Sequence, residues 1–193
     1  MAYITAEARQ ELLDTVAEAT DELGVALSAL GDAYEQLDEA SADALEDELF
    51  RPVQATYGRA RRTHAEFAAR HGLPARTFAP AAHGRPSTGV RGFLEVTAEA
   101  LQRAEDILVE LQDSMSPVEV GDAELRAGLA DVRASAARST SSAASAADPR
   151  PGAQAGARTD ATNPRTSAAG SEYASPSASS TRAMNAVAQS GNG

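Results

Sequence analysis

The sequence predicts an all-α fold, an antiparallel three- to four-helix bundle followed by a disordered, low-complexity C-terminal tail. Apolar residues recur at steps of three and four over several long stretches, which is the period of an amphipathic helix. No stretch alternates apolar and polar residues as a half-buried strand would. Beyond residue 133 the chain contains no Leu, Ile or Phe, which is typical of a segment without a core.

The first helix is expected over residues 5–37, with Thr5 as its N-cap. Gly24 and Gly31 lie seven residues apart on one side of it, so we expect a close backbone neighbour or a small ligand cavity there. Its apolar stripe consists of Ile4, Ala8, Leu12, Val16, Ala19, Leu23, Leu27, Leu30, Tyr34 and Leu37.

The second helix is expected over residues 42–71, with Ser41 as its N-cap. Pro52 lies inside this range, and because proline lacks a backbone N–H it predicts a kink or break near Arg51. Gly72 and Pro74 predict the end of the helix.

A connection over residues 74–88 follows and is longer than the roughly 2–8 residues usual between bundled helices. It therefore indicates either a crossover or a functional loop. The third helix is expected over 89–115, with a regular seam that resembles a coiled coil. That seam consists of Val90, Leu94, Thr97, Leu101, Ala104, Leu108, Leu111 and Met115.

The fourth helix is expected over residues 122–133, or frayed as far as residue 147. Past residue 133 every position due to carry a core side chain is small, namely Ala136, Ser139, Ala143 and Ala147. We therefore divide the chain into a helical bundle, residues 1–133, and a disordered tail, residues 134–193. The tail is either a genuine disordered segment or the product of an out-of-frame reading of GC-rich coding sequence.

Charge is unevenly distributed along the acidic chain, whose net charge is −11. Residues 1–50 carry a net charge of −13 and residues 51–91 a net charge of +7. If the first two helices are antiparallel, paired residue numbers should sum to about 80, because one turn joins the two helices. The expected contacts join Arg70 to Glu7 and Glu11, Arg62 to Asp14 and Glu18, and Arg59 to Glu18 and Asp21. The alternative is two independent solvated faces.

Four basic residues surround the expected start of the third helix and form a candidate anion-binding site: Arg76, His83, Arg85 and Arg91. The free N–H groups of a helix N-terminus favour a bound anion. The segment from Gly84 to Arg91 lacks the Lys-Ser/Thr pair and the preceding strand of a nucleotide-binding P-loop. The alternative interpretation is an ordinary solvated loop.

No motif in the chain indicates catalysis or a cofactor. The sequence has no cysteine and no nucleophile elbow. The Glu-x-x-His motif of di-metal helical bundles is also absent, because no glutamate stands three positions before a histidine. We expect no enzyme activity, no metal, no signal peptide, no membrane span and a cytoplasmic location. The negative charge argues against nucleic acid as a partner.

The leading hypothesis is a non-enzymatic bundle that acts through protein–protein contacts, with itself as a homo-oligomer or with another helical protein. It rests on helical seams that a short fourth helix would leave uncovered. The alternative is binding of a small anion or phosphorylated ligand at the loop of residues 76–91.

Overall fold

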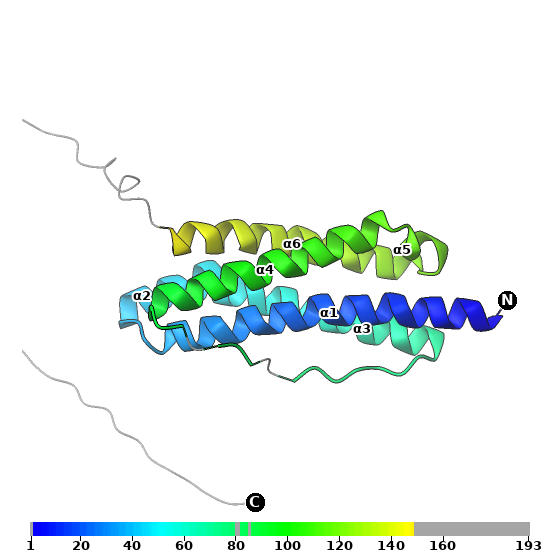
Figure 1. Cartoon of the computed structure of the whole chain (residues 1–193), viewed down its shortest axis with the longest axis horizontal. Coiled ribbons are helices and arrows are strands. Elements are labelled where there is room, and N and C mark those ends of the chain that lie inside the picture. Colours follow the sequence, from blue (N-terminus) through cyan, green and yellow to red (C-terminus); the bar gives the residue numbers. More distant parts are fainter. Residues whose placement is uncertain (1, 80–81, 85, 149–193) are drawn as a thin grey trace, which may run out of the picture. The chain divides into compact units, whose positions relative to one another are not determined.

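The computed structural model describes residues 2–79, 82–84 and 86–148, which form an all-α bundle of four long helices (Figure 1). The long helices are α1 (Ala2–Tyr34), α3 (Arg51–His71), α4 (Val90–Asp113) and α6 (Ala123–Ala147). Short helical segments complete the bundle: α2 (Glu39–Leu45), the π-helix η1 (Glu46–Phe50) and α5 (Ser116–Glu119). The predicted fold class is confirmed. Residues 149–193 of the predicted tail lie outside the described residues.

Each long helix packs against two others. α1 contacts α4 and α3, and α6 contacts the same two helices from the opposite corner. These neighbours are antiparallel, whereas α3 and α4 run in the same direction (Figure 1). The chain must therefore return along the bundle between them, which it does through residues 72–89. We call this segment the crossover.

The crossover follows α1. Arg76 contacts Asp21, and His83 contacts Asp32, which lies 11 residues further along α1. At about 1.5 Å per helical residue, the two contacts are roughly 16 Å apart along the helix axis. The long connection found in the sequence is thus a crossover that spans much of the bundle.

The helix boundaries differ from the predicted ones where capping groups decide them. α1 ends at Tyr34 rather than at residue 37. α2 begins at Glu39, because the Asp38 carboxylate accepts hydrogen bonds from the backbone N–H (3.1 Å) and the hydroxyl (2.8 Å) of Ser41. Asp38, not Ser41, is therefore the N-cap.

Pro52 is accommodated by a local widening of the helix. The five residues of η1 form a π-helix immediately before α3, and the N–H of Arg51 bonds to the carbonyl of Glu46, five residues earlier. Since Pro52 has no N–H to donate and its ring crowds the preceding turn, the wider π turn relieves both problems. The expected irregularity near Arg51 is present as this π turn.

The end of α4 departs from the predicted seam. The helix stops at Asp113, and Met115 follows with a positive φ of 66°. This left-handed conformation turns the chain into α5, and the Met115 side chain is 53% exposed. Met115 therefore does not continue the core stripe, unlike the buried Leu101, Leu108 and Leu111.

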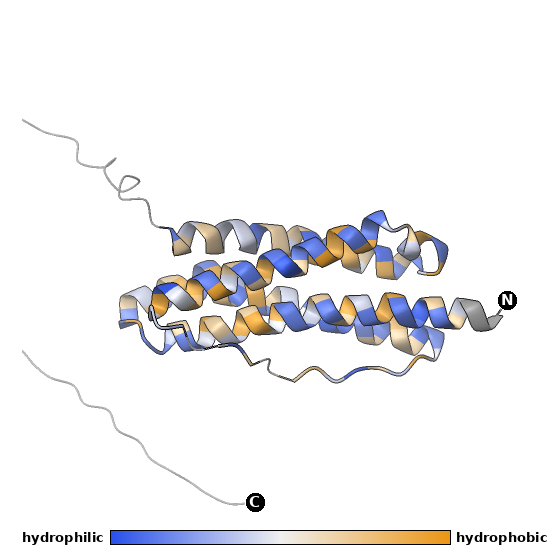
Figure 2. Cartoon of the chain, in the orientation of Figure 1, coloured by the Kyte–Doolittle hydropathy of each residue, from blue (hydrophilic) through white to orange (hydrophobic). Residues whose placement is uncertain are grey.

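α6 continues beyond residue 133, so the boundary drawn there is wrong for residues 134–147. All four small core positions, Ala136, Ser139, Ala143 and Ala147, are buried. In Figure 2 this second half of α6 has the pale colours of weakly polar and weakly apolar residues. The helix packs with small side chains instead of large ones, which requires a close approach to its neighbours.

The close approach of α6 to a neighbouring helix occurs at Gly128. A Cβ on Gly128 would lie 2.6 Å from the hydroxyl oxygen of Thr63 on α3. A Cβ on Gly31 would have nothing within 4 Å, so the expectation of a backbone neighbour there is wrong. Gly31 instead borders open space, which leaves the other expectation, a cavity.

Candidate functional site

The predicted anion-binding residues do not converge in the structure. Arg76 lies 2.8 Å from Asp21, and Arg91 lies 2.9 Å from Glu95 within α4. The His83 ring is nearly buried, with one nitrogen 3.4 Å from Asp32 and the other 2.9 Å from the carbonyl of Gly84. Arg85 lies outside the described residues.

Each of the three described groups therefore already has a carboxylate partner, which is a different residue in each case. The contacts of Arg76 and His83 join the crossover to α1, that of Arg91 lies within α4, and no two of the described candidates share a partner. The prediction of an anion-binding site at the loop of residues 76–91 is not supported by this geometry.

The predicted charge register between the first two long helices is wrong for two of its arginines. Arg70 pairs with Asp122 and Arg59 lies 4.0 Å from Asp131, both on the α6 side of α3 rather than on α1. Within the described ranges, Arg62 makes no ion pair with Asp14 or Glu18. Of the acidic stripe on α1, Glu7, Glu11 and Glu18 are exposed, and Asp21 binds Arg76 of the crossover.

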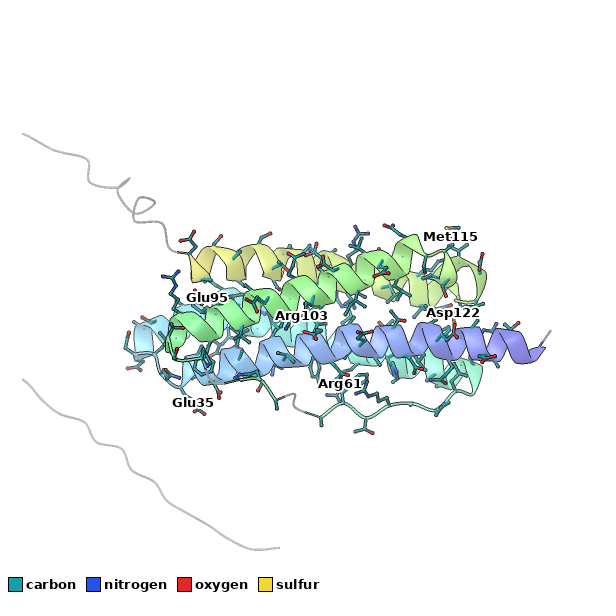
Figure 3. The ribbon with its side chains drawn as sticks, in the orientation of Figure 1. Glu35, Arg61, Glu95, Arg103, Met115 and Asp122 are labelled. Atoms are coloured by element: carbon teal, nitrogen blue, oxygen red, sulfur yellow. The ribbon has the colours of Figure 1, made fainter. Side chains whose placement is uncertain are left out.

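Asp122 is the centre of the strongest polar cluster that the sequence did not indicate. Its carboxylate accepts two hydrogen bonds from Arg70, at 2.8 and 2.9 Å, and lies 3.0 Å from the His71 ring. It also caps α6 by accepting the N–H of Leu125 at 2.7 Å. Figure 3 labels it at the end of the bundle where α6 begins.

The Arg70 guanidinium holds the pKa of the Asp122 carboxyl far below its ordinary value, and the cap to Leu125 acts in the same direction. The carboxylate thus stays ionised while it joins the end of α3 to the start of α6. This role is structural, since all three of its partners belong to the bundle itself.

His64 is buried in the core beneath the crossover. It is 1% exposed, its ring meets Phe78 edge-on at 5.1 Å, and its Nδ1 has no hydrogen-bond partner. Burial lowers the pKa of His64, and the charge of Arg76 lowers it further. The ring is therefore a neutral core group on the buried face of α3.

A pocket of about 410 Å³ opens beside Gly31, where α1 ends and η1 begins. It is lined by Gly31 and Gln54, by the aromatic rings of Tyr34 and Phe50, and by the charged side chains of Glu35, Glu46 and Arg51. Arg51 is neutralised by Glu46 at 2.8 Å and by Asp47. Glu35 and the half-exposed ring of Tyr34 are left as the accessible groups of the pocket.

The surroundings of this pocket are strongly acidic. Residues 32–48 contain eight acidic residues and no basic one. Asp32 lies 3.4 Å from His83, and Arg51 is shared between Glu46 and Asp47. Figure 3 labels Glu35 at this end of the molecule, which we call the acidic end.

The sequence indicated part of this site. The glycine at position 31 was recognised as a candidate cavity residue, but the aromatic and acidic partners were not, because a turn and a π-helix bring them together. Four residues of α6 that line a second groove were assigned to the tail and missed: Ser135, Arg138, Ser139 and Ser142. Their i, i+3, i+4, i+7 pattern was the available signal.

In the described part of the chain, no helix has the length and apolar character needed to cross a membrane. Among the same residues, no group of three or more His, Asp or Glu side chains is placed to hold a metal ion. Comparison of the chain with protein-family models, with curated proteins and with solved structures finds no match.

Proposed function

We propose that this protein acts through protein–protein contacts, without catalysis, by docking a basic segment of another protein at the acidic end. The observation that carries the proposal is the pocket beside Gly31, where the carboxylate of Glu35, which has no ion-pair partner among the described residues, and the accessible ring of Tyr34 lie together in acidic surroundings. A folded chain gains nothing from such a concentration of negative charge, because like charges repel one another.

The pocket fits an arginine or lysine side chain. The cationic head of the incoming side chain can lie over the ring of Tyr34 and pair with Glu35, while the aliphatic stem of that side chain packs against Phe50. A cation–π contact contributes about 0.5–1 kcal/mol at exposed sites, and the surrounding carboxylates attract the partner from a distance. Such a contact is modest in affinity and sensitive to salt.

A different protein fits better than a second copy. The homo-oligomer hypothesis depended on a fourth helix too short to cover the seams, but α6 extends to Ala147 and buries its inner face. Two acidic ends also repel one another. Light scattering at about 100 μM is expected to give one subunit mass, and a dimer would redirect the proposal to self-association.

A titration with a fluorescent oligo-arginine peptide tests the docking site directly. Glu35→Gln and Tyr34→Ala are each expected to weaken binding several-fold, whereas Glu48→Gln, which removes the same charge from an exposed position outside the pocket, changes it little. Equal effects of Glu35→Gln and Glu48→Gln would mean that only net charge matters and that the pocket is not the site.

A further inference from the structure

A groove of about 370 Å³ runs between α3 and α6 and shares no lining residue with the pocket beside Gly31. One wall consists of Pro52, Ala55, Thr56 and Arg59, and the other of Ser135, Arg138, Ser139 and Ser142. Both sets follow the spacing i, i+3, i+4, i+7, so each forms a continuous stripe along its helix. Apart from Arg138, the side chains that α6 offers to the groove are the small ones of three serines, which leaves the groove open.

Two arginines face this groove with little neutralisation. The nearest carboxylate to Arg59 is that of Asp131, at 4.0 Å and largely exposed. Arg138 donates a hydrogen bond to Ser135 at 3.1 Å and, within the described ranges, has no carboxylate within ion-pair distance. Arg51, Arg70, Arg76, Arg91 and Arg103 each have a carboxylate within 2.9 Å.

Ser139 gives an independent indication. It is 3% exposed and lines the groove, yet in the described part of the chain its hydroxyl has no hydrogen-bond partner. The neighbouring hydroxyls of Thr140 and Ser141 donate to the carbonyls four residues before them. Among the described residues, the only fully buried polar side-chain atom without a hydrogen-bond partner is Nδ1 of His64, so the Ser139 hydroxyl stays open to the groove and is free to donate to a bound acceptor.

We propose that this groove binds a phosphate monoester. Guanidinium groups from both walls recognise the oxyanion, and the hydroxyls of Ser139 and Ser142 donate to its remaining oxygens. The volume corresponds to roughly a dozen water molecules at about 30 Å³ each, so it admits an organic group attached to the phosphate. The inference does not depend on the proposed function at the acidic end.

Isothermal titration of the full chain with glycerol phosphate, inorganic phosphate and glycerol tests the ligand class. Glycerol phosphate is expected to bind more tightly than inorganic phosphate, and glycerol is expected not to bind. Equal binding of the two phosphates would mean an adventitious ion only. Absence of heat from glycerol phosphate at millimolar concentration would overturn the proposal.

Arg138→Gln tests the site, with Arg133→Gln as its matched control. Both are arginines of α6, but Arg133 bonds to Gln112 of α4 and lies outside the groove. Arg138→Gln is expected to weaken glycerol phosphate binding at least tenfold, which corresponds to 1.4 kcal/mol. Arg133→Gln is expected to leave the binding constant within about twofold of the original. Equal losses of affinity in the two variants would mean that glycerol phosphate responds to the net charge of the protein and not to the groove.

Ser139→Ala separates a ligand-binding role from a structural one. Because alanine is the better helix former, the substitution is expected to raise the thermal midpoint of the free protein slightly, while glycerol phosphate binding becomes several-fold weaker. A lowered midpoint would show that the hydroxyl supports the fold, and unchanged binding would contradict its assignment as a donor.

Discussion

A single carboxylate, that of Asp122, holds together the end of one helix and the start of another. It contacts Arg70 and His71 from α3 and caps α6 through Leu125. Hydrogen bonds to charged groups contribute about 1.5–3 kcal/mol, more than an exposed ion pair, because geometry and partial burial act together. We therefore expect Asp122 to matter more than any other acidic residue of the bundle.

Asp122→Ala is expected to lower the free energy of unfolding by about 2–3 kcal/mol, because it removes both the cap and the bonds to Arg70. Urea denaturation measures the loss. Asp131→Ala is the control, since its contact with Arg59 is 4.0 Å long and exposed. If the two substitutions cost the same, the Asp122 cluster is not a stabilising contact.

The effect of Asp122 should also depend on pH. Its pKa is lowered from the ordinary value of 3.8 in the folded chain, so its stabilisation is complete above that value. As the pH falls further, the unfolded chain takes up a proton that the folded chain does not, and the stabilisation is lost. The difference between the original chain and Asp122→Ala is therefore expected to shrink in strong acid.

His64 gives the opposite kind of test, because it is a base whose pKa is lowered from 6.5 by burial. Below that pH the unfolded state binds a proton more readily than the folded state, so stability falls as the pH falls. His64→Leu is expected to reduce the slope of unfolding free energy between about pH 7 and about pH 5. An unchanged slope would place the acid sensitivity elsewhere.

At the scale of the element, helical periodicity was enough to identify the core faces. It marked Ala136, Ser139, Ala143 and Ala147 as core positions of α6, and all four are buried. It was misleading about the tail, because small side chains were taken as evidence against packing. Helix packing depends on fit as well as on apolar area, and Gly128 brings α6 close enough to α3 for small residues to suffice.

The ion pairs could not be predicted from the first two helices alone. Arg59 and Arg70 lie on the face of α3 that meets α6, and the position of α6 depends on the crossover. The lining of the pocket at the acidic end could not be predicted either, because the π turn near Pro52 sets the direction of Phe50. Periodicity gives the faces of a helix but not which neighbour each face meets.

Gly128→Ala and Gly58→Ala form a matched pair within helices. Alanine is favoured over glycine by about 1 kcal/mol in a helix interior. A Cβ at position 58 meets nothing within 4 Å, so Gly58→Ala is expected to stabilise, whereas at position 128 the contact with Thr63 outweighs the gain. Thermal midpoints that move in the same direction would show that α6 does not approach α3 this closely.

For the whole molecule, the length of α6 decides where the folded unit ends. A chain that stops after residue 148 is expected to keep the unfolding midpoint of the full chain. A chain that stops after residue 133 loses three buried alanines and Ser139, and is expected to be less stable by about 2–3 kcal/mol. Equal midpoints would restore the boundary at residue 133.

The crossover has a further consequence, because it is the single covalent link between two helical hairpins. α1 with α3 forms one hairpin and α4 with α6 the other, while the contacts of α1 with α4 and of α3 with α6 hold them together. A protease cut within the crossover should therefore leave a nicked but associated molecule. Separately produced halves should recombine through fragment complementation, since the intact crossover adds to these helix contacts an effective concentration in about the millimolar range.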